Sequence, residues 1–330
     1  MAIVKSITGE AFECGANETI VRAALRNGLG FPYECNSGSC GTCKFTVVSG
    51  EFDNLYVGAP GLSERDVKKG RLLGCQCSPV GDVEIKANFD VIYKPVFEPK
   101  SQRAKLVNVK KITHDISEFS FEVECGDRFV GGQYSLIAIP GLGKRAYSMS
   151  NTPNSNRLDF MVKKTNKNGV SDYLFDLKVG DKESTLDVDG PYGIAYYRES
   201  PRDKICLAGG SGLAPMVSIA REHLASGSKS KMTFLMGGRT DSDLLWLHEF
   251  RELVGDDDGV IEYYPVASEN TLANNVISGF LHEALSSVFG NDLQEFDIYC
   301  AGPPALTSSL ELMLHNNNFP INQLYFDRYC

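Results

Sequence analysis

The sequence lacks a surplus of basic side chains. Its 33 lysines and arginines stand against 42 aspartates and glutamates, and the formal net charge is −9. A protein that binds nucleic acid normally carries a basic patch, so this balance disfavours nucleic acid as a partner. Long apolar runs are lacking as well, because stretches such as residues 134–140 fall far short of the roughly 20 residues that a membrane span needs. We therefore expect no membrane span.

The N-terminus lacks the pattern of a secretory signal. No long apolar core follows a basic start in residues 1–15, so we expect a cytoplasmic protein. The ten cysteines do not spread evenly, as a disulfide framework would. In a cytosolic chain, clustered cysteines indicate metal or redox chemistry more often than disulfides. Half of them lie in one short region, namely Cys35, Cys40, Cys43, Cys75 and Cys77.

The first part of the chain predicts a small mixed α/β unit. The 330 residues exceed what one hydrophobic core usually organises, so we expect two or three domains. Residues 1–92 form the first unit, wrapped around the cysteine-rich loop. The strands expected there cover residues 2–7, 44–48 and 83–87, and the helix covers 19–27. Residues 93–101 contain two prolines and no periodic pattern, which predicts a linker.

The rest of the chain predicts two further units. Residues 102–200 contain short β-branched and aromatic runs separated by Gly, Pro and Asn, which indicates a small antiparallel barrel. Residues 201–330 alternate strands with helices, which predicts a mostly parallel sheet covered on both faces. The strands expected there cover 205–208, 232–236, 260–266 and 297–300, and the helices cover 215–226, 243–254 and 304–317. The predicted fold class is therefore α+β with three domains.

The clustered cysteines follow a metal-binding spacing. Cys35, Cys40 and Cys43 form C-x4-C-x2-C, and Cys75 opens the later segment GCQC. Plant-type ferredoxins hold a 2Fe–2S cluster on four thiolates with this spacing. Zinc sites favour paired C-x2–4-C units, which only the last two cysteines of the first motif provide, so zinc is the less favoured alternative.

Residues 1–92 resemble a plant-type ferredoxin domain through FPYECNSGSCGTCKF and GCQC. The resemblance implies a β-grasp fold. It also makes Cys75 the fourth ligand beside Cys35, Cys40 and Cys43, and it leaves Cys77 as a small packed thiol.

A flavin motif lies on a predicted strand of the barrel. Arg145, Tyr147 and Ser148 belong to the segment RAYS. Arginine binds phosphate with two hydrogen bonds, tyrosine offers a flat face to an isoalloxazine ring, and serine can bond the ring edge. The segment resembles the R-x-Y-S motif of the ferredoxin–NADP reductase superfamily, which implies FAD bound in a six-stranded barrel.

The same superfamily has a phosphate loop, which residues 168–171 (NGVS) resemble. Relatives tend to carry Pro and Gly where this chain has Asn166 and Asn168, and asparagine tolerates the left-handed conformation of such a turn. Residues 190–193 (GPYG) resemble a turn that closes the barrel. The further cofactor-binding residues assigned on this ground are Val162, Lys163, Gly169, Val170 and Ser171.

A glycine turn marks the third unit. Residues 205–215 combine a strand, the turn GGSG and a helix start, where backbone N–H groups and the helix N-terminus favour a pyrophosphate. The third glycine of the Rossmann fingerprint is missing, so a standard dinucleotide fold is not indicated. The turn resembles the GGTGxAP segment of the reductase superfamily, and residues 238–239 (GR) and 300–304 (CAGPP) agree. The implied coenzyme-binding residues are Gly210, Ser211, Gly212, Pro215, Arg239 and Gly302.

The resemblance also implies a set of catalytic residues. Cys300 corresponds to a cysteine near the nicotinamide. Asp327 and Tyr329 match the spacing of an acidic and an aromatic residue that close the flavin site, with a frayed terminus as the alternative. The complete catalytic set is Tyr147, Ser148, Cys300, Asp327 and Tyr329.

Charges near the third unit's second strand bear on the choice of coenzyme. NADPH needs cationic or hydroxyl partners for its 2′-phosphate, which Arg239 and Thr240 could supply. Asp241 and Asp243 follow, however, and two carboxylates near that phosphate would repel it. We therefore predict a preference for NADH.

The resemblance spans essentially the whole chain, in the order ferredoxin, FAD barrel, NAD domain. The chain is similar to reductase components of bacterial multicomponent oxygenases, particularly those of toluene/xylene monooxygenase and carbazole dioxygenase systems. It implies a monomer that passes electrons from NADH to FAD, to the 2Fe–2S cluster and to a terminal oxygenase or hydroxylase component, directly or through a separate ferredoxin. A reductase of the same architecture that serves a deoxysugar dehydrase, and a zinc-bearing β-grasp binding module, are the alternatives.

Overall fold

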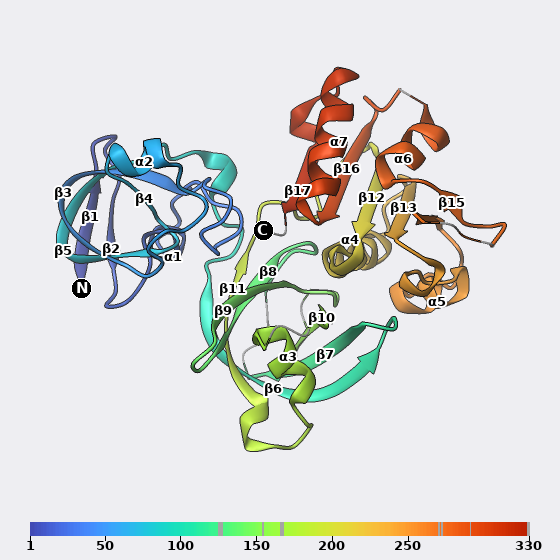
Figure 1. Ribbon diagram of the computed structural model, residues 1–330, viewed down its shortest axis with the longest axis horizontal. Coiled ribbons are helices and arrows are strands. Elements are labelled where there is room, and N and C mark those ends of the chain that lie inside the picture. The colour runs from blue at the N-terminus through green and yellow to red at the C-terminus, as the bar shows by residue number, and fades with distance from the viewer. Residues whose placement is uncertain are drawn as a thin grey trace.

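The computed structural model describes residues 1–124, 128–153, 155–165, 168–269, 271, 273–290 and 292–328. Within these residues the strands form three sheets, which follow one another along the chain (Figure 1). No helix in the described residues has both the length and the apolar character that crossing a membrane requires.

The first sheet has the order β2-β1-β5-β3-β4. Its elements are β1 (Ala2–Ser6), β2 (Ala11–Cys14), β3 (Lys44–Asn54), β4 (Arg71–Leu73) and β5 (Cys77–Lys86), with helices α1 (Ile20–Arg26) and α2 (Glu64–Lys68). Strands β1 and β5 are parallel, and the other pairs are antiparallel. Helix α1 begins after Thr19, whose side chain accepts the N–H of Arg22, and it buries its apolar residues in the core. This is the expected β-grasp arrangement.

Strands β3 and β5 are longer than their sequence signals. Their pairing continues to Asn54 and Cys77, through register shifts on either side of Ser49. Gly50, with φ of +93°, lies in this irregular stretch. The strand expected over residues 44–48 ends just before this glycine. In the structure, bulges let β3 and β5 stay paired beyond it.

The second sheet has the order β10-β7-β6-β11-β8-β9, and every pair in it is antiparallel. Its strands are β6 (Lys100–Lys111), β7 (Ile116–Val123), β8 (Tyr134–Ile139), β9 (Gly143–Ser148), β10 (Arg157–Lys163) and β11 (Thr185–Tyr192). An antiparallel bridge between Met149 and Phe160 brings the end of β9 to β10 and curls the sheet into the expected barrel. The short helix α3 (Val170–Asp176) follows β10.

Two sequence expectations in this region are corrected. Residues 190–192 do not form a separate turn, because they continue β11 to Tyr192 with a register shift after Asp189. Strand β6 begins at Lys100, inside the expected linker, because Lys100 and Ser101 pair with Gly190 and Asp189. Both differences reflect pairing between distant strands that local composition does not show.

The third sheet is parallel throughout, in the order β15-β14-β13-β12-β16-β17. Its strands are β12 (Asp203–Gly209), β13 (Met232–Gly238), β14 (Ile261–Ala267), β15 (Ile277–Ser278), β16 (Phe296–Gly302) and β17 (Leu324–Arg328). Its helices are α4 (Leu213–Ser226), α5 (Leu247–Val254), α6 (Leu281–Phe289) and α7 (Pro304–Asn316).

Helices cover both faces of this sheet, as predicted (Figure 1). Successive residues of β12 enter different cores: Cys206 packs with α4 and α5, whereas Ile205 and Leu207 pack with α6 and α7. The helix expected over 243–254 begins only at Leu247. Its expected start is wrong because Asp243 ends a 3-10 turn, in which its carboxylate accepts the N–H of Thr240.

Candidate functional site

Four cysteine thiols converge in the first domain. Cys43 and Cys75, from the two ends of the cysteine-rich region, have their Sγ atoms 3.3 Å apart. The Sγ of Cys35 accepts the N–H groups of Ser37 and Cys40, each at 3.4 Å. A hydrogen bond from the Cys40 thiol, helped by those two N–H groups, holds the pKa of Cys35 well below its ordinary value. The four thiols are a set of soft sulfur donors, which fits an iron–sulfur cluster.

Glycines shape the loop that carries these thiols. Gly38 and Gly41 have φ of +82° and +77°, which L side chains rarely adopt. A Cβ on Gly41 would lie 2.5 Å from the carbonyl oxygen of Gly61, so a side chain there would displace the loop. Cys77 begins β5 with its side chain fully buried, and among the described residues its thiol forms no hydrogen bond with the other four cysteines. Burial raises the pKa of its thiol to about 12. This placement fits a packed thiol better than a ligand.

The flavin motif meets the end of the third sheet. Ser148, at the end of β9, donates a 2.7 Å hydrogen bond from its hydroxyl to the carboxylate of Asp327 in β17. Burial raises the pKa of Asp327 to about 6. Tyr147 is partly buried against the barrel core, and Arg145 is exposed on the same strand. The structure thus brings three predicted residues, Tyr147, Ser148 and Asp327, to one edge of the barrel. Tyr329 lies outside the described residues.

Only part of the expected phosphate loop lies within the described residues, and some of its polar groups already form hydrogen bonds within the protein. Asn168 adopts the left-handed conformation expected for it, with φ of +51°, while Asn166 lies outside the described residues. The N–H of Gly169 already donates to the Asp172 carboxylate at 3.3 Å. The Ser171 and Thr165 hydroxyls are 2.7 Å apart and form a hydrogen bond.

Two apolar residues of the predicted FAD set have side chains in the core. Val162 and Val170 are buried in the barrel, so their side chains are not available to a cofactor. Their assignment stays a prediction, and any contact from them would come from the backbone. Val162 faces the core because a strand alternates its faces, and Val170 begins α3 with its side chain in the same core. The neighbouring Lys163 points outward and forms a 2.8 Å ion pair with Asp115.

A cavity of about 710 Å³ lies where the glycine turn meets the barrel. Gly210 and Ser211 line it at the carboxyl end of β12, and Asp115 and Lys163 line it from the barrel. A Cβ on Gly210 would meet no atom within 4 Å, so open space adjoins the turn. Because α4 begins directly after this turn, the cavity has the shape and the positive helix end that suit a pyrophosphate.

Glycines also allow the turn between β12 and α4 to lie against β16. A Cβ on Gly212 would lie 2.1 Å from the carbonyl oxygen of Ala301, and one on Gly302 would lie 3.0 Å from that of Gly209. Gly302 and Gly212 therefore shape the turn. Pro215 is buried in the first turn of α4 and does not line the cavity.

Arg239 and Asp243, which we expect to influence the choice of coenzyme, line the cavity. One oxygen of the Asp243 carboxylate accepts the N–H groups of Arg239 and Thr240, each at 3.0 Å. Although burial raises the pKa of Asp243, these N–H groups outweigh it and hold the pKa below its ordinary value. Asp241 does not line the cavity, so only one of the two carboxylates expected near a coenzyme phosphate is placed there.

Cys300 does not reach this cavity. Its side chain is fully buried in the core beneath α6 and α7, and burial raises the pKa of its thiol. The residue lies in β16 opposite Phe326, next to the Ala301–Asp327 pair. The expected proximity to a nicotinamide is therefore not met in this conformation, because Cys300 points to the opposite face of the sheet from Ala301.

Sequence reasoning missed several residues at these sites. Phe280 and His282 line the cavity with their rings stacked, 6.0 Å between centroids. They begin the helix α6, which carried no recognised signal. Tyr33 and Tyr134 join the cysteine loop to the barrel: the Tyr33 hydroxyl accepts the N–H of Gly193 at 3.0 Å, and the Tyr134 hydroxyl donates to the carbonyl oxygen of Glu34.

Comparisons with known proteins agree with these sites. The family model of the 2Fe-2S iron-sulfur cluster binding domain matches residues 4–80. The oxidoreductase FAD-binding domain matches residues 103–197, and the oxidoreductase NAD-binding domain matches residues 206–311. Together with the four thiols, the first match removes the zinc alternative.

Relatives match nearly the full chain. The ferredoxin–NAD(P)(+) reductase CarAd of Metapseudomonas resinovorans is 32% identical over 324 residues, which cover 96% of each chain. The ferredoxin–NAD(+) reductase component of the alkene monooxygenase system of Xanthobacter autotrophicus is 34% identical over 328 residues, which cover 97% of this chain and 98% of that one. The solved structure of the ferredoxin reductase in carbazole 1,9a-dioxygenase has a TM-score of 0.91 at 30% identity, covering 99% of this chain and 98% of that chain. The chain therefore belongs to the family of ferredoxin–NAD(P)+ reductases, flavin- and iron–sulfur-dependent oxidoreductases that combine a 2Fe–2S, an FAD-binding and an NAD-binding domain.

Proposed function

We propose that this protein is the reductase component of an oxygenase system. It takes electrons from NADH and delivers them, through FAD and the 2Fe–2S cluster, to a terminal oxygenase or hydroxylase component, directly or through a separate ferredoxin. The relatives from alkene monooxygenase and xylene/toluene monooxygenase systems support an oxygenase as the partner.

One observation carries the electron path within the chain. Glu34 of the cysteine loop, Tyr134 of the barrel and Asp327 of the third sheet line one small hollow. Glu34 directly precedes the ligand Cys35, and Asp327 is hydrogen-bonded to Ser148 of the flavin motif. Residues of all three domains therefore meet at one hollow, which supports a relay of electrons between them.

The protein's residues hold and orient the redox groups. When bound, FAD accepts a hydride from NADH and releases its electrons singly to the cluster. Cys35, Cys40, Cys43 and Cys75 hold the cluster, while Arg145, Tyr147 and Ser148 hold the flavin. The turn around Gly210 receives the coenzyme pyrophosphate, and Asp327 orients the reacting groups through Ser148.

The organisation of the chain follows the same proposal. We assign residues 1–92 to the ferredoxin domain, 93–99 to a linker, 100–200 to the FAD-binding domain and 201–330 to the NAD-binding domain, because β6 begins at Lys100. A monomer suffices, because one chain supplies every residue of the relay. A cytoplasmic location is supported by the described cysteines, none of which forms a disulfide, as expected in a reducing compartment.

The test uses the purified protein with its FAD and cluster. Anaerobic NADH should first bleach the flavin absorbance and then produce the electron paramagnetic resonance signal of a reduced 2Fe–2S cluster. Added oxygenase components should then hydroxylate their substrate at the expense of NADH. A flavin that bleaches while the cluster stays oxidised would overturn the relay, and hydroxylation that does not depend on this protein would overturn the assigned partner.

A further inference from the structure

We infer that Arg22 and Asp189 are positioning residues, which lock the ferredoxin domain onto the FAD barrel and thereby fix the cluster relative to the flavin. This inference rests on the proposed electron relay. Neither residue belongs to the cofactor sites described above, and no motif in the sequence singles out either of them.

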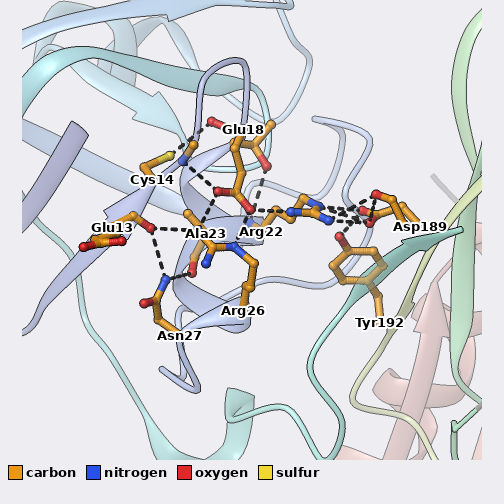
Figure 2. A network of polar contacts seen from close by, with 12 residues as sticks. Glu13, Cys14, Glu18, Arg22, Ala23, Arg26, Asn27, Asp189 and Tyr192 are labelled. Carbon is orange, nitrogen blue, oxygen red and sulfur yellow. Dashed lines mark hydrogen bonds and ion pairs between the residues drawn. The ribbon is translucent and has the colours of Figure 1, made fainter. Parts of the chain in front are cut away.

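The two side chains form a forked ion pair across the domain boundary (Figure 2). Arg22 lies on α1, and Asp189 lies in β11, 167 positions later. The Nε atom of Arg22 donates to both carboxylate oxygens, at 3.0 and 3.1 Å, and Nη2 donates to Oδ1 at 2.9 Å. A planar guanidinium that engages a carboxylate in this way fixes direction as well as distance, which a lysine could not do.

Each partner is held by neighbours from its own domain. Glu18 accepts hydrogen bonds from Arg22 and from Arg26, and so orients the guanidinium from the side of α1. The Ser101 hydroxyl donates to Asp189 at 2.7 Å, and the Tyr192 hydroxyl donates to the other oxygen of the same carboxylate. Figure 2 shows this chain of contacts running from α1 to Asp189 and Tyr192. The side chains are thus preorganised before the domains meet.

Burial makes the pair costly to break. The side chains of Asp189 and Arg22 keep only 9% and 23% of their surface exposed. Although burial raises the pKa of Asp189, hydrogen bonds from Arg22 and Tyr192 outweigh it and hold the pKa below its ordinary value. Removing one partner would leave the other as a desolvated charge without compensation, whereas an exposed pair contributes little.

The same end of β11 also carries the groups that hold the cysteine loop. The ring of Tyr192 stacks on Tyr134, with 5.8 Å between centroids, and meets the edge of Tyr33 at 6.2 Å. The Tyr134 hydroxyl donates to the carbonyl oxygen of Glu34 in the cysteine loop, and the Tyr33 hydroxyl accepts the N–H of Gly193. The ion pair and the loop contacts therefore form two ends of one interface. Loss of the ion pair would let the domain pivot on the loop contacts and would change the orientation of the cluster.

The test compares Asp189→Asn and Arg22→Gln with a matched control in the loaded full-length protein. The control is Asp187→Asn, two positions away in the same strand, where Asp187 forms an exposed pair with Arg103 at 2.9 Å. Stopped-flow absorbance separates flavin reduction by NADH from the later reduction of the cluster. Hydrogen–deuterium exchange of the cysteine loop and of residues 189–193 reports docking without any turnover.

We expect both variants to reduce their flavin, and added ferricyanide, within twofold of the wild-type rate. The flavin-to-cluster step should slow at least tenfold, and amide exchange at the interface should rise at least fivefold. Asp187→Asn should match the wild-type protein. FAD content, iron content and the cluster signal should stay unchanged throughout.

Unchanged cluster reduction and amide exchange in both variants would overturn the positioning role. If Asp189→Asn loses FAD, Arg22→Gln decides the question, because its substitution lies outside the barrel. A normal flavin-to-cluster rate in Arg22→Gln then contradicts the inference. If NADH fails to reduce the cluster in the wild-type protein itself, the proposed function fails instead, so the two failures are distinguishable.

Discussion

The hydroxyl group of Ser148 lies 2.7 Å from a carboxylate oxygen of Asp327 and donates a hydrogen bond to it, although 179 positions separate the two residues. Ser148 ends β9 of the barrel, and Asp327 lies in the outermost strand of the third sheet. The flavin motif and the nicotinamide-binding domain thus share one polar pair. Because burial desolvates the Asp327 carboxylate, its ionised form lowers the stability of the folded protein. Such a loss of stability is common at residues that serve a function.

That cost predicts a pH-dependent gain in stability for Asp327→Asn. Burial raises the pKa of Asp327 to about 6, from about 3.9 for an ordinary aspartate, so folding favours its protonated form. The stability from this residue is complete below about pH 4 and is lost as the pH rises through 6. Asparagine stays neutral, so we expect the variant to melt a few degrees higher than wild type at pH 8, with a smaller gain at pH 5. Circular dichroism during heating measures both, and equal melting temperatures at pH 8 would contradict the expectation.

The cysteine assignment predicts opposite results for two neighbouring substitutions. Cys75→Ser should lose most of its iron and sulfide, because the Cys75 thiol converges with that of Cys43. Cys77→Ser should keep a full cluster, because the buried Cys77 thiol forms no hydrogen bond with the other described cysteines, although the buried hydroxyl should lower the melting temperature. Iron and acid-labile sulfide assays on both proteins make the comparison, with FAD content as the control. A full cluster in Cys75→Ser together with an empty Cys77→Ser would reverse the assignment.

The cavity predicts that NADH is preferred and that one carboxylate enforces the preference. Asp243 lines the cavity beside Arg239, whereas Asp241 does not. Asp243→Asn keeps an oxygen for the N–H groups of Arg239 and Thr240 and removes the negative charge that would repel a 2′-phosphate. We expect kcat/KM for NADPH to rise about tenfold and that for NADH to change little, which corresponds to about 1.4 kcal/mol. Steady-state kinetics with ferricyanide test this, and Asp241→Asn should show no such gain.

Phe280 predicts a separable effect on coenzyme affinity. Its ring is largely exposed at the cavity wall, where it can stack on the flat base of the coenzyme. Stacking of a base on an aromatic side chain contributes about 1–3 kcal/mol, so Phe280→Ala should raise KM for NADH at least fivefold with little change in kcat. Tyr56→Ala removes an exposed ring of the ferredoxin domain and should leave KM unchanged. A wild-type KM in Phe280→Ala would show that the ring does not contact the coenzyme.

Local spacing alone led to the predictions for two of the three sites. Cys35, Cys40 and Cys43 lie in one loop, so the sequence itself brings their thiols together, and the glycine turn at Gly210 likewise needs only its neighbours. The spacing could not show which way a strand residue faces. Val162 and Cys300 were expected at cofactors but lie in cores, because each strand alternates its faces and only packing selects the exposed one.

The sequence by itself determined the order of the domains, and its local motifs predicted the cluster ligands and the coenzyme turn. Only the tertiary structure decided that Ser148 meets Asp327 and that Arg22 meets Asp189. Strand pairing and the docking of domains fix such contacts, and their energies depend on burial and on geometry between segments far apart in the chain. Composition and local motifs do not contain those quantities. For that reason the contacts that join the three domains were visible only in the folded molecule.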